Sequence, residues 1–169
     1  MTTTKGEKVS DLMRFGMTFE APYTMDKSNY YGRGPIENYV DRKFSQRLGL
    51  YEQTADEQFY PYMRPQETGN KTDIRWWQQT DGNGSGLKMS SEKFEMSALH
   101  YAQSDLDDGD EKDQRHSPEV PKSKFTNLII SQAQYGLGGI NSWGAIPLEQ
   151  YRLPYADRTF TFVLSPVVK

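Results

Sequence analysis

Short runs of alternating apolar and polar residues, each ended by glycine, proline, asparagine or aspartate, constrain this chain more than any other feature. Residues 13–19 alternate in this way, and so do residues 93–98. Alternation is typical of a strand with one buried face, because successive side chains point to opposite sides. Residues 81–86 read DGNGSG, a composition typical of a hairpin loop. The pattern predicts an all-β fold, an antiparallel β-sandwich.

Three further segments fit the same pattern. Residues 74–76 form a strand that runs into the hairpin loop, residues 125–130 a buried strand, and residues 160–164 a final strand. Trp76 and Trp77 are adjacent, so in a strand they point to opposite faces. Core packing is the preferred interpretation for both, and one of them can instead lie at the surface or an interface.

Two segments depart from the strand pattern. Val40, Phe44 and Leu48 recur every four residues, which predicts one short helix over residues 37–48. Residues 104–121 are strongly polar and predict an exposed loop, with at most a turn of helix. Its acidic run does not match the twelve-residue calcium loop, because the glycine comes one position early and the closing acid is missing. A solvated loop is therefore the preferred interpretation.

Composition limits the class of protein. A chain of 169 residues suits one domain, here residues 11–169 behind a flexible tail of residues 1–10. Aromatic residues make up 13% of the chain, whereas disordered segments are poor in them. The net charge of -3, with no basic stripe, argues against a nucleic-acid partner. No apolar run has the length of a membrane span, and the N-terminal residues do not form a signal peptide.

The residues available for chemistry are few. The chain has no cysteine, which excludes disulfides, a thiolate nucleophile and cysteine-bound metals, and leaves the compartment open. His100 and His116 are too far apart in sequence to indicate a metal cluster or a catalytic dyad. We expect His100 to be a structural or interface residue near the end of a strand, and His116 to lie in the polar loop.

Trp143 is the strongest candidate binding residue. It lies in the segment GGINSWG, residues 138–144. Glycines let the backbone adopt conformations that other residues resist, and an indole offers a flat apolar plate to a ring-shaped ligand. The alternative is that these glycines only mark a turn between two strands.

Three motifs occur in a fixed order along the chain. They are YYGRGPIENYVDR at residues 30–42, YPYMRPQETGN at residues 60–70, followed by DIRW at residues 73–76, and GGINSWG at residues 138–144. Together they resemble motifs in the C-terminal "small chain" domain of bacterial β-galactosidases of glycoside hydrolase family 2. The resemblance spans about residues 13 to 165.

The resemblance implies a galactose-mutarotase-like supersandwich. The family's domain is usually longer than this chain, so we expect its first strands to lie outside this sequence. Glycoside hydrolysis normally needs two carboxylates beside the scissile bond, and none of the 23 acidic residues stands out as half of a pair. In the family, the two catalytic carboxylates lie on a (β/α)₈ barrel of about 250 residues, so the chain alone should be inactive.

The resemblance also implies partners and a location. The partners are the catalytic barrel and other domains of a parent β-galactosidase, a terminal β-D-galactoside that is hydrolysed with retention, and further copies of the protein. Magnesium and sodium, which such enzymes usually use, would bind other domains, so no cofactor is expected in this chain. The location would be the cytoplasm or periplasm of a bacterium.

Site residues follow from the same resemblance. Trp143, with Asn141 and Ser142, would line the sugar site, although Ile140 stands where the family commonly has an acid. In the first motif, two glycines and a proline would permit a tight turn, and charge-assisted bonds of Asp41 and Arg42 would fasten it. The residues with this architectural role are Gly32, Gly34, Pro35, Glu37, Asn38, Tyr39, Asp41 and Arg42.

Two other functions fit the same residues. A free-standing carbohydrate-binding or mutarotase-like sandwich would bind sugar without a hydrolase partner. A purely structural interaction domain would bury Trp143. If early strands lie elsewhere, an open sheet edge or an uncovered apolar face should also lead the chain to self-associate.

Overall fold

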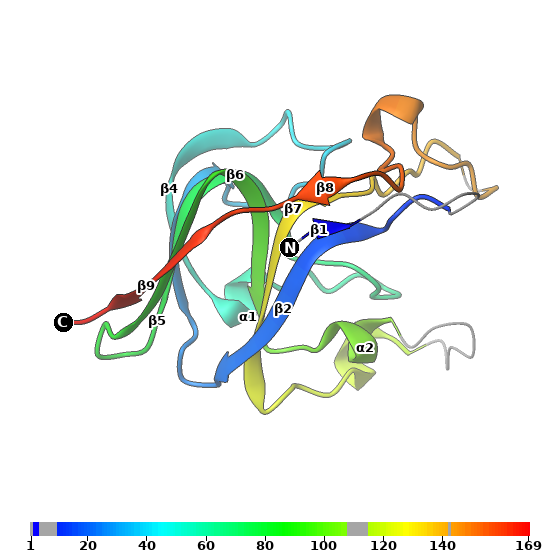
Figure 1. The fold of residues 1–169 in the computed structure, drawn as a ribbon. Helices are drawn as coiled ribbons and strands as arrows, with labels where there is room; N and C mark the ends of the chain where they lie inside the picture. Colours follow the sequence, from blue (N-terminus) through cyan, green and yellow to red (C-terminus); the bar gives the residue numbers. More distant parts are fainter. Residues whose placement is uncertain (1, 4–9, 108–114, 142) are drawn as a thin grey trace.

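The computed structural model describes residues 2–3, 10–107, 115–141 and 143–169. Its strands all pair antiparallel, in one seven-stranded and one two-stranded sheet (Figure 1). This confirms the all-β, sandwich-like class that the alternating runs predicted. The strands are β1 (Thr2–Thr3), β2 (Arg14–Pro22), β3 (Lys27–Gly34), β4 (Arg47–Thr54), β5 (Lys71–Thr80), β6 (Gly86–Leu99), β7 (Phe125–Gln134), β8 (Arg158–Thr159) and β9 (Val163–Val167).

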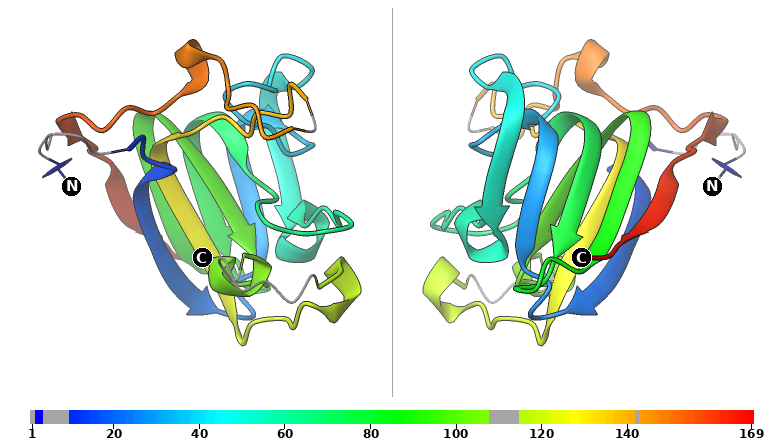
Figure 2. Two further views of the ribbon diagram at one scale, coloured as in Figure 1. Left: turned by 90° about the vertical axis from the view of Figure 1, so that its right-hand side faces the viewer. Right: turned by 90° about the vertical axis from the view of Figure 1, so that its left-hand side faces the viewer.

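The large sheet has the order β2-β7-β6-β5-β3-β4, and β9 joins it beside β6. Along one edge of the long strand β6, residues 86–90 pair with β9 and residues 95–99 pair with β7. The sheet therefore forks along this edge, and it curves around an interior (Figure 2). Short helical segments α1 (Ala55–Gln58), α2 (Gln103–Leu106), η1 (Ser117–Glu119) and η2 (Glu149–Tyr151) connect the strands.

Aromatic rings fill much of the interior. Trp77 is fully buried and stacks on Tyr30 with their ring centroids 4.6 Å apart. The neighbouring Trp76 points to the other face of β5 and is half-buried, with the Lys88 ammonium 5.4 Å from its ring centroid. One tryptophan is thus in the core and the other is at the surface.

The predicted strands are present, and the burial of their side chains differs from the predicted alternation in two places. A register shift between Phe15 and Gly16 interrupts the alternation in β2, and Met17 remains exposed on this edge strand. In β6, Glu95 was predicted to point outward and is buried instead, because the other face of this strand is covered as well. The final strand lies three residues later than predicted: β9 runs from Val163 to Val167, after the buried Phe160.

The predicted helix over residues 37–48 is wrong. The segment forms bends and an isolated bridge between Tyr39 and Arg42, and β4 begins at Arg47. Phe44 is 77% exposed, so the apolar residues at four-residue spacing do not share a buried face. Asn38 donates side-chain hydrogen bonds to the carbonyls of Arg33 and Ile36, which offers the backbone an alternative to a helix.

His100 has the structural role that its position predicted. It is buried directly after β6, and its ring stacks on Tyr23 with a centroid distance of 3.8 Å. Its Nδ1 lies 3.0 Å from Asp56 Oδ1, and its Nε2 lies 3.2 Å from the carbonyl oxygen of Tyr23. His116 lies in the loop region, where its Nδ1 is 2.8 Å from the Met63 carbonyl oxygen.

The polar region contains the predicted turn of helix, α2, and the 3₁₀ turn η1. Of the acidic run that was compared with a calcium loop, Asp105 and Asp107 are described, and residues 108–113 lie outside the described residues. Within the described ranges, no group of three or more histidine or acidic residues is placed to hold a metal ion. Among the helices described, none is long and apolar enough to cross a membrane. From the predicted tail, Thr2–Thr3 form β1, which pairs with β8.

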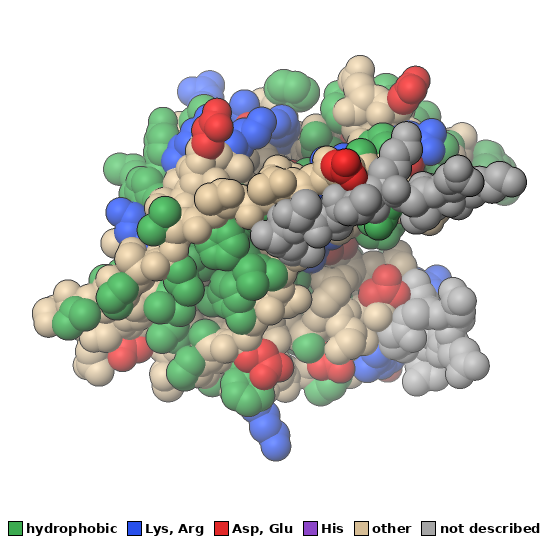
Figure 3. Space-filling model, in the orientation of Figure 1, with side chains coloured by type: hydrophobic (Ala, Val, Ile, Leu, Met, Phe, Trp, Pro, Cys, Tyr) green, Lys and Arg blue, Asp and Glu red, His purple; other side chains and the backbone are tan. Residues whose placement is uncertain are grey.

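One face of the molecule is open and apolar. Figure 3 shows hydrophobic side chains gathered between β9 and β2, the two strands located in Figure 1. A cavity of about 200 Å³ lies here, lined mainly by apolar residues of β2, β6, β7 and β9. Exposed apolar areas of this kind are common at sites of protein association.

Candidate functional site

Trp143 lies on the segment that connects β7 to η2, and its side chain is 90% exposed. Leu137, Ile140, Ile146 and Leu148 on the same segment are also exposed. The segment thus exposes an indole and four aliphatic side chains. The exposure contradicts the purely structural interpretation, which required a buried Trp143.

Local hydrogen bonds shape the tip of this segment. Asn141 Oδ1 accepts hydrogen bonds from the backbone N–H of Trp143 at 2.9 Å and of Ala145 at 3.4 Å. Gly139 and Gly144, on either side, have φ angles of 81° and 79°, where glycine is strongly preferred. Asn141 therefore holds the backbone that carries Trp143. Ser142, the third residue predicted to line a sugar site, lies outside the described residues.

Asp41 fastens the base of the same segment. Its Oδ2 accepts a hydrogen bond from the backbone N–H of Gly138 at 2.9 Å. At Gly136, a Cβ would lie only 2.7 Å from the same oxygen, so a larger residue there would push the Asp41 carboxylate away. Residues 35–46 and the Trp143 segment lie side by side at one end of the sheet (Figure 2). The first and the last motif are thus in contact.

Glu37 is the centre of the first motif. Its side chain is only 5% exposed, and its two oxygens accept hydrogen bonds from several donors. Oε1 pairs with Arg42 Nη2 at 2.7 Å and with the Tyr62 hydroxyl. Oε2 accepts the backbone N–H of Gly69 at 2.7 Å. Glu37 therefore ties the first motif to the second, and its oxygens are already used by the protein.

Asn38 and Tyr39 are fully buried next to Glu37. Asn38 Oδ1 accepts hydrogen bonds from the backbone N–H of Thr72, at 2.9 Å, and from the Thr72 hydroxyl. Tyr39 lies under the Arg42 guanidinium, 4.8 Å from the ring centroid. Burial, together with the nearby Glu67 and Glu37 carboxylates, raises the pKa of Tyr39. Through these contacts, Asn38 and Tyr39 connect the first motif to β5 and to Arg42.

Gly32 and Gly34 do not form the tight turn that the sequence analysis expected. Both lie within β3, and the bend begins after them, at Pro35. A Cβ at Gly32 would lie 2.2 Å from Ile74 Cδ1, and a Cβ at Gly34 would lie 2.5 Å from the Tyr30 hydroxyl. These glycines are needed for close packing inside the sheet.

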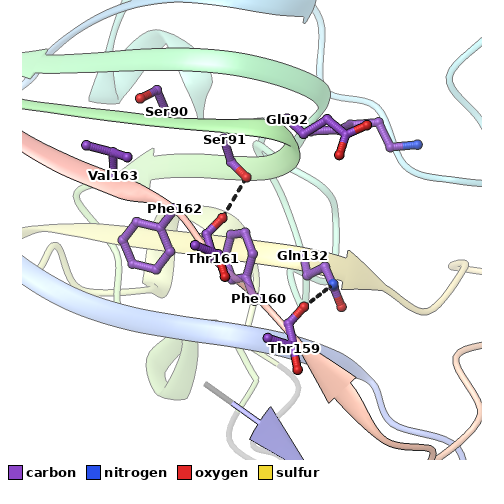
Figure 4. Close-up of a pocket in the computed structure, with 10 residues that line it drawn as sticks. Ser90, Ser91, Glu92, Gln132, Thr159, Phe160, Thr161, Phe162 and Val163 are labelled. Atoms are coloured by element: carbon purple, nitrogen blue, oxygen red, sulfur yellow. Dashed lines mark hydrogen bonds between the residues drawn. The ribbon is translucent and has the colours of Figure 1, made fainter.

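A second hollow, of about 540 Å³, lies at the fork of β6 (Figure 4). Two of its polar side chains hold the end of β8 and the segment that follows it. Ser91 Oγ donates to the Thr161 carbonyl at 2.8 Å, and Gln132 Nε2 donates to the Thr159 carbonyl at 2.6 Å. Glu92 is the one carboxylate among the residues that line it. A single acid does not provide the two carboxylates that glycoside hydrolysis needs.

Sequence patterns did not reveal the buried ionisable residues. Glu95 accepts a hydrogen bond from Asn70 Nδ2 at 3.0 Å, and burial raises its pKa to about 7. Burial lowers the pKa of Lys71 to about 8. Glu67 pairs with Arg14 at 2.7 Å, and burial raises its pKa. Only the three-dimensional packing shows that these side chains are enclosed.

Comparisons with known proteins identify relatives of this chain. Residues 1–164 match the family described as beta galactosidase small chain. The chain is 37% identical to a β-galactosidase of Priestia megaterium over 95% of its own length, and 37% identical to the β-galactosidase BgaC of Bifidobacterium adolescentis over 88%. A β-galactosidase of Lactobacillus delbrueckii subsp. bulgaricus is 36% identical over 82% of the chain.

These matches cover only a small part of each relative. The chain spans 15% of the Priestia protein, 14% of the Bifidobacterium protein and 13% of the Lactobacillus protein. The relatives therefore contain other domains besides the part that matches. The three motifs, their contacts in the fold and the match over nearly the whole sequence lead to one conclusion: this chain belongs to the β-galactosidase small chain family.

Proposed function

We propose that this chain forms one wall of the sugar site of a β-galactosidase, with Trp143 as an apolar plate for the substrate. The observation that supports this most directly is the 90% exposure of Trp143 on a segment held by Asn141 and Asp41. Large amphipathic rings are typical of binding surfaces.

In this proposal, other domains carry out the chemistry. The relatives are named β-galactosidase, and the chain corresponds to about 15% of their length. The most enclosed acid of the first motif, Glu37, has both oxygens bonded to donors and so serves as an anchor. The reaction would be the hydrolysis of terminal β-D-galactosides, with both catalytic carboxylates on another domain of the parent enzyme.

Trp143 would act by covering the apolar face of a sugar ring, either of the incoming substrate or of its leaving group. Asn141 would act indirectly, because its side-chain oxygen is used to hold the Trp143 backbone. Ile140 is exposed and apolar, so it would contribute surface and not the charge that an acid would supply.

The division of labour can be tested with a chromogenic β-galactoside. The 169-residue chain alone should not hydrolyse it, whereas the full-length protein that carries the chain should. Substantial turnover by the chain alone would refute the proposal.

The alternative, a free-standing sugar-binding module, is tested by calorimetry. Such a module should bind galactose or lactose by itself, whereas a wall of a composite site should bind them poorly. Saturable binding of galactose by the isolated chain would favour the alternative.

A further inference from the structure

Strand β5 bulges where it passes the first motif. The register pairs Lys71–Met96 and Ile74–Phe94 frame the bulge, so that three steps along β5 correspond to two steps along β6. Asp73 lies in this bulge with a φ of 55°, and among the described residues it is the one residue other than glycine with a positive φ. Such a backbone is strained, and both bulges and strained residues are frequent beside functional sites, where they re-aim a side chain.

The Asp73 carboxylate binds two cationic side chains from outside β5. Its Oδ2 accepts a hydrogen bond from Arg33 Nε at 2.5 Å, and Lys43 Nζ lies 3.2 Å from each of its two oxygens. The Asp73 side chain is only 13% exposed. Burial alone would favour the neutral acid, but the bonds to Arg33 and Lys43 outweigh it and lower the pKa of Asp73. Arg33 also donates to the Gln46 carbonyl at 2.7 Å, so one carboxylate holds both ends of the bend between β3 and β4.

The bulge holds this bend on both sides of Asp41. Lys43 is two residues after Asp41, and Asn38, three residues before it, accepts the backbone N–H of Thr72 at 2.9 Å. Thr72 is the neighbour of the bulged aspartate in β5. Asp41 in turn accepts the Gly138 N–H at the base of the segment that carries the exposed indole. A continuous series of bonds therefore runs from the bulge in β5 to that segment.

We propose that Asp73 is a positioning residue for Trp143. It fixes the bend through Arg33 and Lys43, and the bend fixes the indole-bearing segment through Asp41. Asp73 acts through these residues and does not touch the substrate, because its carboxylate is used inside this domain. The effect on substrate rests on the proposed function of Trp143, whereas the effect on the segment does not.

The test is Asp73→Asn in the full-length protein that carries this chain, with hydrogen exchange measured by mass spectrometry. Asparagine tolerates a positive φ and has the same size, so the variant removes the charge and keeps the bulge. Exchange over residues 35–46 and 136–147 should become roughly 2- to 30-fold faster, as for substitutions that act on a coupled site, and exchange over residues 125–134 should not change. Asp81→Asn, in the hairpin loop at the other end of β5, should leave all three ranges unchanged.

Unchanged exchange over residues 136–147 in Asp73→Asn would overturn the proposal. An equal increase over residues 125–134 would do the same, because it would show a loss of stability in the whole sheet and not a loosened segment. Lys43→Met keeps the bond between Arg33 and Asp73, so the test does not depend on how well Asp73→Asn folds. This variant should show a smaller increase over the same two ranges, and no increase would count against the proposal.

Kinetics of the same full-length variant separates this inference from the proposed function. With a chromogenic β-galactoside, KM should rise roughly 2- to 30-fold in Asp73→Asn while kcat stays within about twofold, since the substitution weakens binding and leaves the catalytic groups in place. Faster exchange over residues 136–147 with an unchanged KM would confirm the positioning of the segment and refute the sugar-binding role of Trp143. A raised KM with unchanged exchange would refute the positioning role of Asp73.

Discussion

The carboxylate of Asp41 accepts a hydrogen bond from the backbone N–H of Gly138, 97 residues further along the chain, at 2.9 Å. This bond joins the first motif of the sequence to the segment that carries Trp143. The architectural motif therefore does more than shape its own bend, because it also fixes the base of the candidate sugar-binding surface.

Removal of the Asp41 carboxylate should loosen that segment. Asp41→Ala leaves the Gly138 N–H without its acceptor, and hydrogen bonds to charged groups contribute about 1.5–3 kcal/mol. Because Asp41 is partly exposed, we expect the variant to lose about 1 kcal/mol of the free energy that keeps this segment closed. The loss should appear as faster hydrogen exchange over residues 136–147. Glu149→Ala, which removes an exposed acid nearby in sequence, should leave this exchange unchanged. Unchanged exchange in Asp41→Ala would argue against the anchor.

Asn38 should be important for the stability of the whole sheet. Asn38→Ala leaves the Thr72 N–H and the carbonyls of Arg33 and Ile36 without these partners inside the protein. Each unsatisfied buried group costs about 1–3 kcal/mol, so the free energy of unfolding in urea should fall by about 3 kcal/mol. Gln150→Ala, at an exposed position, should change it by less than about 0.5 kcal/mol. Similar values for both variants would contradict this role.

Glu95 should make stability depend on pH. Burial raises its pKa in the folded state from 4.5 to about 7, so the folded state holds this proton more tightly than the unfolded state. The stabilisation is complete below about pH 4.5 and is lost as the pH rises through 7. By linkage the loss is on the order of 3 kcal/mol.

Glu95→Gln is the matched control, since it removes the titration and keeps the shape. The free energy of unfolding of the unmodified chain, measured relative to that of Glu95→Gln, should fall between pH 5 and pH 8. A difference between the two proteins that stays constant with pH would show that Glu95 is not enclosed as described.

The open apolar face should lead the isolated chain to associate. Leu164 lines the apolar cavity between β2 and β9 and is exposed, and Met17 of β2 and Val163 of β9 are exposed on the two strands that border it. Light scattering after gel filtration should show a mass that rises with concentration, and Leu164→Lys should reduce it. A strictly monomeric chain at all concentrations would contradict the prediction.

The sequence predicted the strands well because alternation reports directly on which side chains face a core. It failed at residues 37–48, where side-chain hydrogen bonds of Asn38 hold bends in a segment with helical spacing. It also failed at Glu95, because alternation assumes one exposed face and this part of β6 is covered on both. Long-range packing decides such cases.

The candidate site was predictable in part. The glycines around Trp143 indicated an exposed ring, and the structure has one. The contact between Asp41 and Gly138 was not predictable, since nothing local connects residues so far apart in sequence. Lys71 carries no motif that distinguishes it from a surface lysine, and only its enclosure does so.

The affinity of the full-length enzyme for a β-galactoside after Trp143→Ala tests the central claim most directly. Aromatic contacts contribute about 0.5–1.5 kcal/mol beyond the area that they bury, so KM should rise by about 2- to 13-fold or more while the stability of the protein stays the same. Leu148→Ala, which shortens another exposed side chain of the same segment, should change KM by less than about twofold. An unchanged KM in Trp143→Ala would contradict the role of this indole as a wall of the sugar site.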